Sequence, residues 1–232
     1  MNQHDWRIVV AGEGGQGVQL IGEILAESAY QAGMEALYIP NFGVEQRGGV
    51  SIAMVQISHQ AIAAPKFEKA DILAPLSQRA IERTKGYISN DTIYIFDSSG
   101  LKPPQVHDEA AGIHMWDTVA PEAFSLAVGT EAQEPSRPPT EPGVKPRRIV
   151  GIPAATMARD EFKPRVFNKL ILGAIVAASN VLPLKMVEEG LLVKLGDKLQ
   201  RDPELRELNL RALAQGASYV IERSQEEGSR LE

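Results

Sequence analysis

The first stretch that can do chemistry is a glycine-rich loop, directly after the apolar run 8–11 and before a helix-like segment. Glycine costs backbone entropy on folding, so such a cluster predicts positive φ angles or the close approach of another group. Consecutive N–H groups at a helix N-terminus favour an anion such as a phosphate or carboxylate. The side chain of Gln16 can add two donors and an acceptor. The glycine loop consists of Gly12, Glu13, Gly14, Gly15, Gln16 and Gly17.

A second loop of unusual composition follows the next predicted strand. Arg47 within it can grip a phosphate or carboxylate with two parallel hydrogen bonds. The alternative is a surface turn with a local ion pair, worth less than about 1 kcal/mol. Both loops follow strands, so we expect them at the carboxyl edge of the sheet, where open α/β sheets bind ligands. The residues of this Arg47 loop that we expect to contact a ligand are Asn41, Glu45, Arg47, Gly48 and Gly49.

Two other interpretations of the glycine loop stay open. Gly12, Gly14 and Gly17 satisfy the dinucleotide spacing G-x-G-x-x-G, but the second strand ends Tyr38-Ile39-Pro40-Asn41, without the acid that holds a ribose. Alternatively, the glycines only allow a strand and a helix to pack closely.

Other candidate residues favour structural roles. The histidines at positions 4, 59, 107 and 114 show no metal-ligand spacing. The acids at 97, 108 and 117 end predicted elements and are expected to act as caps and turns. Asn168 lies in an apolar helix, where an internally bonded amide is the more common case. We therefore assign no catalytic residue and no metal ligand.

The elements that position these loops alternate between strand and helix. The periodicity predicts strands near 7–11, 36–39, 50–58, 71–74, 92–97 and 148–153. It predicts helices at 18–32, after Ser77 as the N-cap, at 165–180, at 183–199 and at 204–223, with a weak one after Pro121. The first two strands and the helix between them form a βαβ opening. The expected fold is therefore α/β, a three-layer α/β/α arrangement with a Rossmann-like sheet opening and a helical C-terminal part.

Composition limits the function classes further. The chain has 232 residues, a formal net charge of −6 and no basic block, which argues against nucleic-acid binding. The sequence contains no cysteine, so it cannot supply thiolates to an iron–sulfur cluster. It lacks a signal peptide and a membrane-length apolar run, and we expect a cytoplasmic protein.

We expect one domain at 1–228. Five prolines within 129–147 predict a surface insertion there. The residues at 229–232 form a tail that a cloning vector can supply.

Taken together, these motifs resemble the gamma subunit of 2-oxoacid:ferredoxin oxidoreductases, which include the pyruvate, 2-oxoglutarate, ketoisovalerate and indolepyruvate enzymes. The joint presence of both loops is the specific feature. The match is close over the first 75 residues and looser over 153–182, about half the chain. The residues that carry it are Gly-x-Gly-Gly-Gln-Gly at 12–17, Phe-Gly-Val-Glu-Gln-Arg-Gly-Gly at 42–49, Ala70-Asp71-Ile72-Leu73, Asn168 and Leu172-Gly173-Ala174.

The resemblance implies a subunit that is not itself catalytic. Its complex would decarboxylate a 2-oxoacid oxidatively, pass electrons to ferredoxin and deliver the acyl group to coenzyme A. Alpha and beta subunits, and in some members a delta subunit, would hold thiamine diphosphate, magnesium and iron–sulfur clusters. We expect this chain to hold no cofactor alone but to help form the coenzyme A site. The alternatives are a free-standing Rossmann-like oxidoreductase that binds NAD or FAD, and an assembly module without a ligand.

Overall fold

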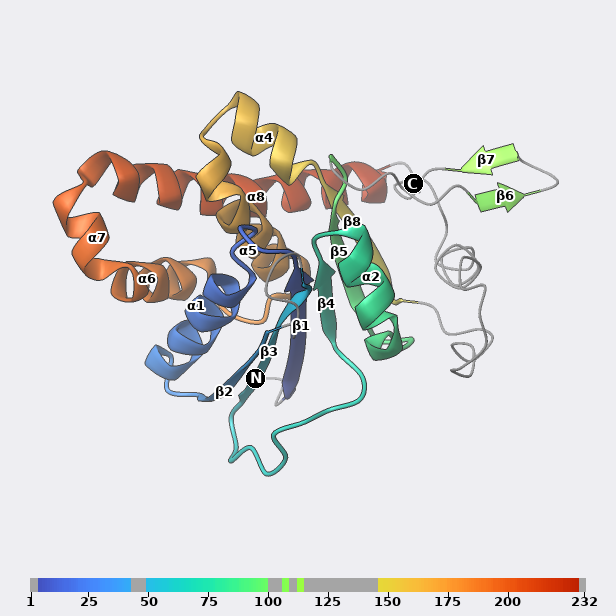
Figure 1. The fold of residues 1–232 in the computed structure, drawn as a ribbon, viewed down its shortest axis with the longest axis horizontal. Coiled ribbons are helices and arrows are strands. Elements are labelled where there is room, and N and C mark those ends of the chain that lie inside the picture. Colours follow the sequence, from blue (N-terminus) through green and yellow to red (C-terminus); the bar gives the residue numbers. More distant parts are fainter. Residues whose placement is uncertain (1–3, 43–48, 100–105, 109–111, 115–145, 230–232) are drawn as a thin grey trace.

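The computed structural model describes residues 4–42, 49–99, 106–108, 112–114 and 146–229. Its centre is a six-stranded sheet in the order β2–β3–β1–β4–β5–β8 (Figure 1). The strands of this sheet are β1 (Trp6–Gly12), β2 (Glu35–Asn41), β3 (Ser51–Ser58), β4 (Ile72–Pro75), β5 (Ile93–Asp97) and β8 (Arg148–Ile152). A separate antiparallel pair joins β6 (Val106–Asp108) to β7 (Gly112–His114).

The sheet is parallel in one half and antiparallel in the other. Strand β1 pairs parallel with β4, and β4, β5 and β8 continue in the same direction. On its other side β1 pairs antiparallel with β3, and β3 pairs antiparallel with β2. Strands β1 and β2 therefore run in the same direction, but β3 lies between them. The predicted βαβ opening exists with this strand inserted into it.

The helices fall at or near the predicted places, except the one at 154–160, where no helix was predicted. They are α1 (Val18–Gln31), α2 (Gln78–Thr84), α4 (Ala154–Asp160), α5 (Phe167–Ser179), α6 (Leu184–Lys194), α7 (Gly196–Arg201) and α8 (Pro203–Ser229), with short 3-10 turns η1 (Lys85–Tyr87) and η2 (Pro164–Val166). Ser77 caps α2 as predicted, since its side chain accepts a hydrogen bond from the N–H of Ala80. None of the helices in the described ranges is long and apolar enough to cross a membrane.

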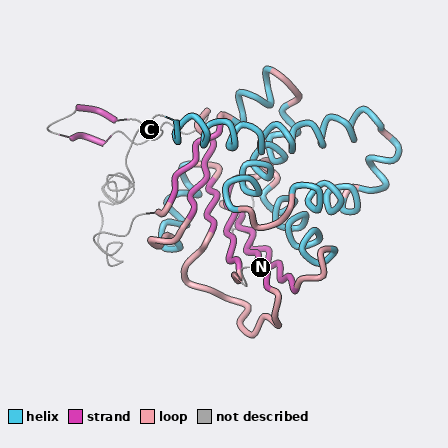
Figure 2. The backbone as a smooth tube through the Cα atoms, turned by 180° about the vertical axis from the view of Figure 1, so that it is seen from behind, coloured by secondary structure: helices cyan, strands magenta, loops and turns pink. Residues whose placement is uncertain are grey.

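The sheet separates two apolar layers, as the alternation of side chains along each strand requires. Ile8 and Val10 of β1 belong to the larger cluster, which includes residues of α1, α5, α6 and α8. Val9 and Ala11 face the other way and pack with Ala80 and Ile81 of α2. Figure 1 shows α2 alone over β4 and β5, and Figure 2 shows the same strands from behind with most helices gathered to one side. The predicted three-layer α/β/α fold is confirmed.

Small residues allow close helix crossings within the larger layer. A Cβ on Gly216 of α8 would overlap the backbone carbonyl of Leu170 on α5, and one on Gly173 would overlap that of Leu213. A Cβ on Gly190 of α6 would overlap Ser28 of α1. The helical C-terminal part is therefore fitted to α1 and α5 by glycine contacts.

One prediction needs correction, and two others fall wholly or mostly outside the described residues. The predicted helix at 183–199 is wrong as a single element: it ends at Lys194, Leu195 leaves the helical conformation (φ −103°, ψ 8°), and α7 begins at Gly196. Glycine at this junction has low helix propensity, which fits the break. The weak helix after Pro121 and most of the 129–147 insertion lie outside the described residues, so both stay predictions.

Candidate functional site

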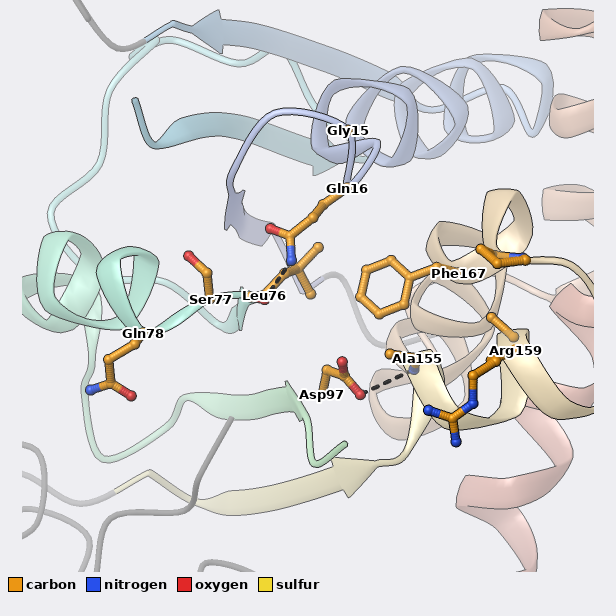
Figure 3. Close-up of a pocket in the computed structure, with 11 residues that line it drawn as sticks. Gly15, Gln16, Leu76, Ser77, Gln78, Asp97, Ala155, Arg159 and Phe167 are labelled. Atoms are coloured by element: carbon orange, nitrogen blue, oxygen red, sulfur yellow. Dashed lines mark hydrogen bonds between the residues drawn. The ribbon is translucent and has the colours of Figure 1, made fainter. Parts of the chain in front are cut away.

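A large hollow lies at the carboxyl ends of the parallel strands. It is a crevice with a volume of about 820 Å³, open to solvent, between the glycine loop and α4 (Figure 3). Its lining residues come from the ends of β1, β4 and β5 and from the segment after β8. They are Gly15, Gln16, Leu76, Ser77, Gln78, Asp97, Ala155, Ala158, Arg159, Pro164 and Phe167.

The strand order explains why the crevice forms here. From β1 the chain passes through α1 to β2 and β3 on one side, and then crosses to β4 on the other side. Helix α1 packs on one face of the sheet and α2 on the opposite face. Their loops therefore diverge where β1 meets β4. Ligands in open α/β sheets bind at such a switch point, outside the carboxyl ends of the strands.

Within the glycine loop, the Gln16 side chain has a structural role. Its Oε1 accepts a hydrogen bond from the N–H of Glu13 at 2.6 Å, and its Nε2 donates to the carbonyl of Leu76 at 2.7 Å. A Cβ on Gly12 would lie 2.5 Å from this Oε1. The loop is thus closed on itself and tied to the end of β4, and Gly12 makes room for the amide. Only one N–H of Gln16 stays available to a ligand.

Gly17 is also required by packing. It adopts φ +72° at the N-cap of α1, and a Cβ there would overlap the side chain of Asn168. The Oδ1 of Asn168 accepts a hydrogen bond from Nζ of Lys169 at 3.0 Å, and both residues are buried. Asn168 is therefore internally bonded, as predicted. Burial, with a smaller contribution from Lys198, lowers the pKa of Lys169 to about 8.

Gly14 and Gly15 differ from these packed glycines. A Cβ on either would meet nothing within 4 Å. Gly15 has φ +92°, which favours glycine, whereas Gly14 is not among the glycines with positive φ. Helix α1 has no side-chain N-cap and no acid in its first turn, so its first N–H groups have no capping side chain. This end of the loop offers donors to an anion.

The structure brings the glycine loop and the start of the Arg47 loop to one edge of the sheet. Gly12 pairs with Ser51, and Asn41 pairs with Ile52, so β1 and β2 end together with β3 between them. Asn41 is exposed and Gly49 half-buried. Glu45, Arg47 and Gly48 lie outside the described residues. The shared edge is as predicted.

The crevice, however, opens on the other side of β1, toward β4, β5 and β8. Because β3 lies between β1 and β2, the end of β2 is not next to the glycine loop within the sheet. This arrangement does not favour a dinucleotide site that would use the end of β2 for the ribose.

Several residues of the crevice were not predicted as site residues. Asp97 is buried, and its Oδ1 accepts hydrogen bonds from the N–H of Ser99 at 3.1 Å and of Ala155 at 3.3 Å. It therefore caps a turn and the start of α4, as predicted, but it also lines the crevice. The sheet-edge rule that drew attention to the first two loops applies equally to the ends of β4 and β5. Phe167 has no comparable signal, because it follows a 3-10 turn far along the chain.

Comparison with known proteins tests the predicted family. The sequence model of "Pyruvate ferredoxin/flavodoxin oxidoreductase" matches residues 7–219. The chain belongs to this family. Among its relatives, 2-oxoglutarate synthase subunit KorC of Methanocaldococcus jannaschii is 27% identical over 217 residues, which cover 93% of this chain and 94% of KorC. The predicted resemblance to gamma-type subunits of these oxidoreductases is confirmed.

Other family members are longer. Ketoisovalerate oxidoreductase subunit VorA of Methanothermobacter thermautotrophicus is 25% identical over 216 residues. The match covers 93% of this chain but only 36% of VorA, so the chain spans about a third of that relative.

Solved structures of the oxidoreductase family share the fold. The gamma subunit of a keto/oxoacid ferredoxin oxidoreductase from Geobacter sulfurreducens PCA has a TM-score of 0.61 at 22% identity, covering 93% of this chain and 98% of that subunit. The 2-oxoglutarate:ferredoxin oxidoreductase from Magnetococcus marinus, solved with 2-oxoglutarate, coenzyme A and succinyl-CoA bound, has a TM-score of 0.64 at 23% identity. The match covers 93% of this chain and 31% of the Magnetococcus chain.

Proposed function

We propose that this chain is the gamma-type subunit of a 2-oxoacid:ferredoxin, or related acceptor, oxidoreductase complex. The complex oxidatively decarboxylates a 2-oxoacid to an acyl-CoA in the cytoplasm. The observation that carries this proposal is the nearly end-to-end match with KorC, which covers 93% of this chain and 94% of the relative. A chain of this size and family is expected to work beside larger partners rather than alone.

The reaction chemistry belongs to the partner subunits in this proposal. Alpha and beta subunits, with a delta subunit in some members, would hold thiamine diphosphate, magnesium and the iron–sulfur clusters. Cysteine thiolates are the usual cluster ligands, and this sequence contains none, which supports placing the clusters elsewhere. Ferredoxin would then receive electrons from the partners.

This chain's own contribution would be to bind coenzyme A. The uncapped first turn of α1 and the open space over Gly14 and Gly15 suit the phosphates of that molecule. Arg47 would add a bidentate contact from the loop that follows β2. The relative from Magnetococcus marinus, solved with coenzyme A bound, lends support to this assignment.

Assembly and activity test the proposed subunit role. The tagged chain is purified from its native host, and the proteins that accompany it are identified. The complex is then assayed for acyl-CoA formation and acceptor reduction with pyruvate, 2-oxoglutarate, ketoisovalerate and indolepyruvate. We expect large partner subunits and activity with at least one 2-oxoacid. Recovery of the chain alone, with full activity in a complex that lacks it, would show the proposal to be wrong.

The coenzyme A contribution has a separate test on the assembled complex. Isothermal titration should show weaker coenzyme A binding after Arg47→Ala, because a bidentate phosphate contact is lost. Arg206→Ala, an exposed position on α8, is the matched control and should bind as wild type does. Equal affinity in both variants would remove Arg47 from the site.

A further inference from the structure

We propose that the crevice beside the glycine loop receives the base-and-sugar end of a nucleotide-type ligand. The group that enters would be an uncharged planar ring with hydrogen-bond donors, while its phosphates point outward to the start of α1. The inference rests on the proposed function, because coenzyme A is the ligand that would bring such a group here. It differs from a simple anion site in what occupies the interior.

The inner wall of the crevice carries an acceptor without a donor. Asp97 is only 4% exposed, and its Oδ1 is occupied by Ser99 and Ala155. Within the described part of the chain, Oδ2 accepts no hydrogen bond, and it points into the hollow (Figure 3). Oδ2 is thus an acceptor turned toward the hollow, and it can accept a hydrogen bond from a ligand donor, such as a ring amino group or a sugar hydroxyl. A phosphate or the carboxylate of a small oxoacid would be repelled at this position.

The opposite wall is apolar and contains an aromatic ring. Phe167 projects across the hollow toward Leu76 and Gln16 (Figure 3). Ala155 and Ala158 of α4 add small apolar surfaces beside it. A flat heterocycle can pack against Phe167 in an offset or edge-on arrangement while its edge reaches Asp97.

Positive character lies at the outside of the crevice. The first turn of α1 has no acid and no side-chain cap, and its positive dipole end follows closely after Gly15 and Gln16, which line the crevice. Arg159 lies at the rim, exposed, and is paired with Asp160 at 2.7 Å. An acceptor inside and donors outside define one orientation, with the ring inward and the phosphates outward.

Ligand-observed NMR can test the interior site on the isolated full chain, because every lining residue belongs to it. Adenosine is the probe for the ring, and inorganic pyrophosphate is the probe for the outer donors. We expect saturation transfer to adenosine. We also expect the amide signals of Leu76 and Ala155 to shift on titration, a readout that needs no variant. If the wild-type chain shows no saturation transfer to adenosine, the inference is overturned.

Substitutions assign the contacts. Phe167→Leu keeps an apolar side chain but removes the ring, and should weaken adenosine binding about fivefold. Asp97→Asn keeps an oxygen for the N–H of Ala155 but replaces the free acceptor with a donor, and should weaken it about tenfold. Phe162→Leu is the matched control, because Phe162 is also half-buried but packs under Arg211 outside the crevice.

The pattern across probes decides the outcome. Adenosine affinity that is unchanged in both Phe167→Leu and Asp97→Asn, with folding confirmed by circular dichroism, overturns the inference. Pyrophosphate binding should not fall in either variant, and a parallel loss of both probes would also overturn it. Coenzyme A should displace adenosine at lower concentration than NADH does, and the reverse order would assign the ring site to a dinucleotide.

This test is separable from that of the proposed function. If the native complex assembles and forms acyl-CoA but adenosine does not bind, only the inference fails. If adenosine binds as expected but no partner subunit accompanies the chain, the proposed function fails. The inference that the crevice binds the base and sugar of a nucleotide-type ligand then still holds.

Discussion

At the scale of one residue, Gly14 is a position where a substitution should affect ligand binding but not the stability of the fold. Its missing side chain faces open space, and it is not among the glycines with positive φ. Gly14→Ala should therefore change the free energy of unfolding by less than about 0.5 kcal/mol. It should still weaken coenzyme A binding to the complex, because a methyl group would obstruct the approach of a phosphate to the loop. Urea unfolding and isothermal titration measure the two effects.

Gly17→Ala is the contrasting variant in the same loop. Its positive φ and the overlap with Asn168 should lower the stability by about 2 kcal/mol or more. If Gly14→Ala proved as destabilising as Gly17→Ala, the open space over Gly14 would have a structural role after all.

Lys169 makes a pH-dependent contribution to stability. Burial lowers its pKa to about 8 in the folded chain, against an ordinary value of 10.5. Below pH 8 the side chain is charged in both states, and the cost of burying the charge is fully present. Between pH 8 and 10.5 only the unfolded chain keeps the proton, so the contribution of Lys169 to stability rises with pH, by up to about 3 kcal/mol.

The comparison with Lys169→Met isolates this contribution, because other titrating groups such as Tyr94 are common to both proteins. At pH 7 the variant should unfold at higher urea concentration than wild type. At pH 10 the difference should have largely disappeared. A difference that is the same at both pH values would show that the folded-state pKa of Lys169 is not lowered.

At the scale of elements, the α5–α8 crossing is the contact most sensitive to added volume. Gly216→Ala would place a methyl group on the carbonyl of Leu170, a backbone atom that cannot turn away. The gain in helix propensity, about 1 kcal/mol, is smaller than the cost of forcing two buried helices apart. We expect a net loss of about 2 kcal/mol in urea unfolding.

Gly196→Ala, at the start of α7, is the control for that substitution. A Cβ there would meet nothing within 4 Å, so the added methyl group should be neutral or stabilising by up to about 1 kcal/mol. Equal losses in both variants would mean that the crossing is looser than the contacts indicate.

The sequence predicted most elements because their patterns are local. The apolar run at 8–11 and the capping Ser77 are visible within a few residues, and both are confirmed. The insertion of β3 between β1 and β2 could not be predicted from the sequence, because strand order depends on long-range pairing. The junction at Leu195 was missed because the apolar positions at 183–199 fit one continuous helix.

At the scale of the whole molecule, hydrogen exchange can locate the ligand. Coenzyme A should slow amide exchange at the ends of β1 and β4 and in α4, the three sides of the crevice, when added to the complex. The β2–β3 pairing farther from this edge should be unaffected. Protection confined to residues 41–49 would instead place the ligand over the Arg47 loop alone.

The candidate site was predictable only in part. The glycine loop was found because its composition is unusual within six residues, and it does line the crevice through Gly15 and Gln16. The other walls were not found, because Asp97 and Phe167 line one crevice only when β5 and α5 are placed together by the fold. Gln16 also has a structural role that was not predicted, since its amide bonds to Glu13 and Leu76 and keeps only one N–H for a ligand.

The hydrogen bonds of the Gln16 amide should affect the rate at which a ligand associates with the crevice. One side chain fixes the loop after β1 to the strand beside it, so the mouth of the crevice keeps its width before any ligand arrives. A site that is already formed needs no slow opening step, and its observed association rate should rise linearly with ligand concentration. Replacing this amide would let the two strand ends separate, and closing of the loop would then limit the association rate.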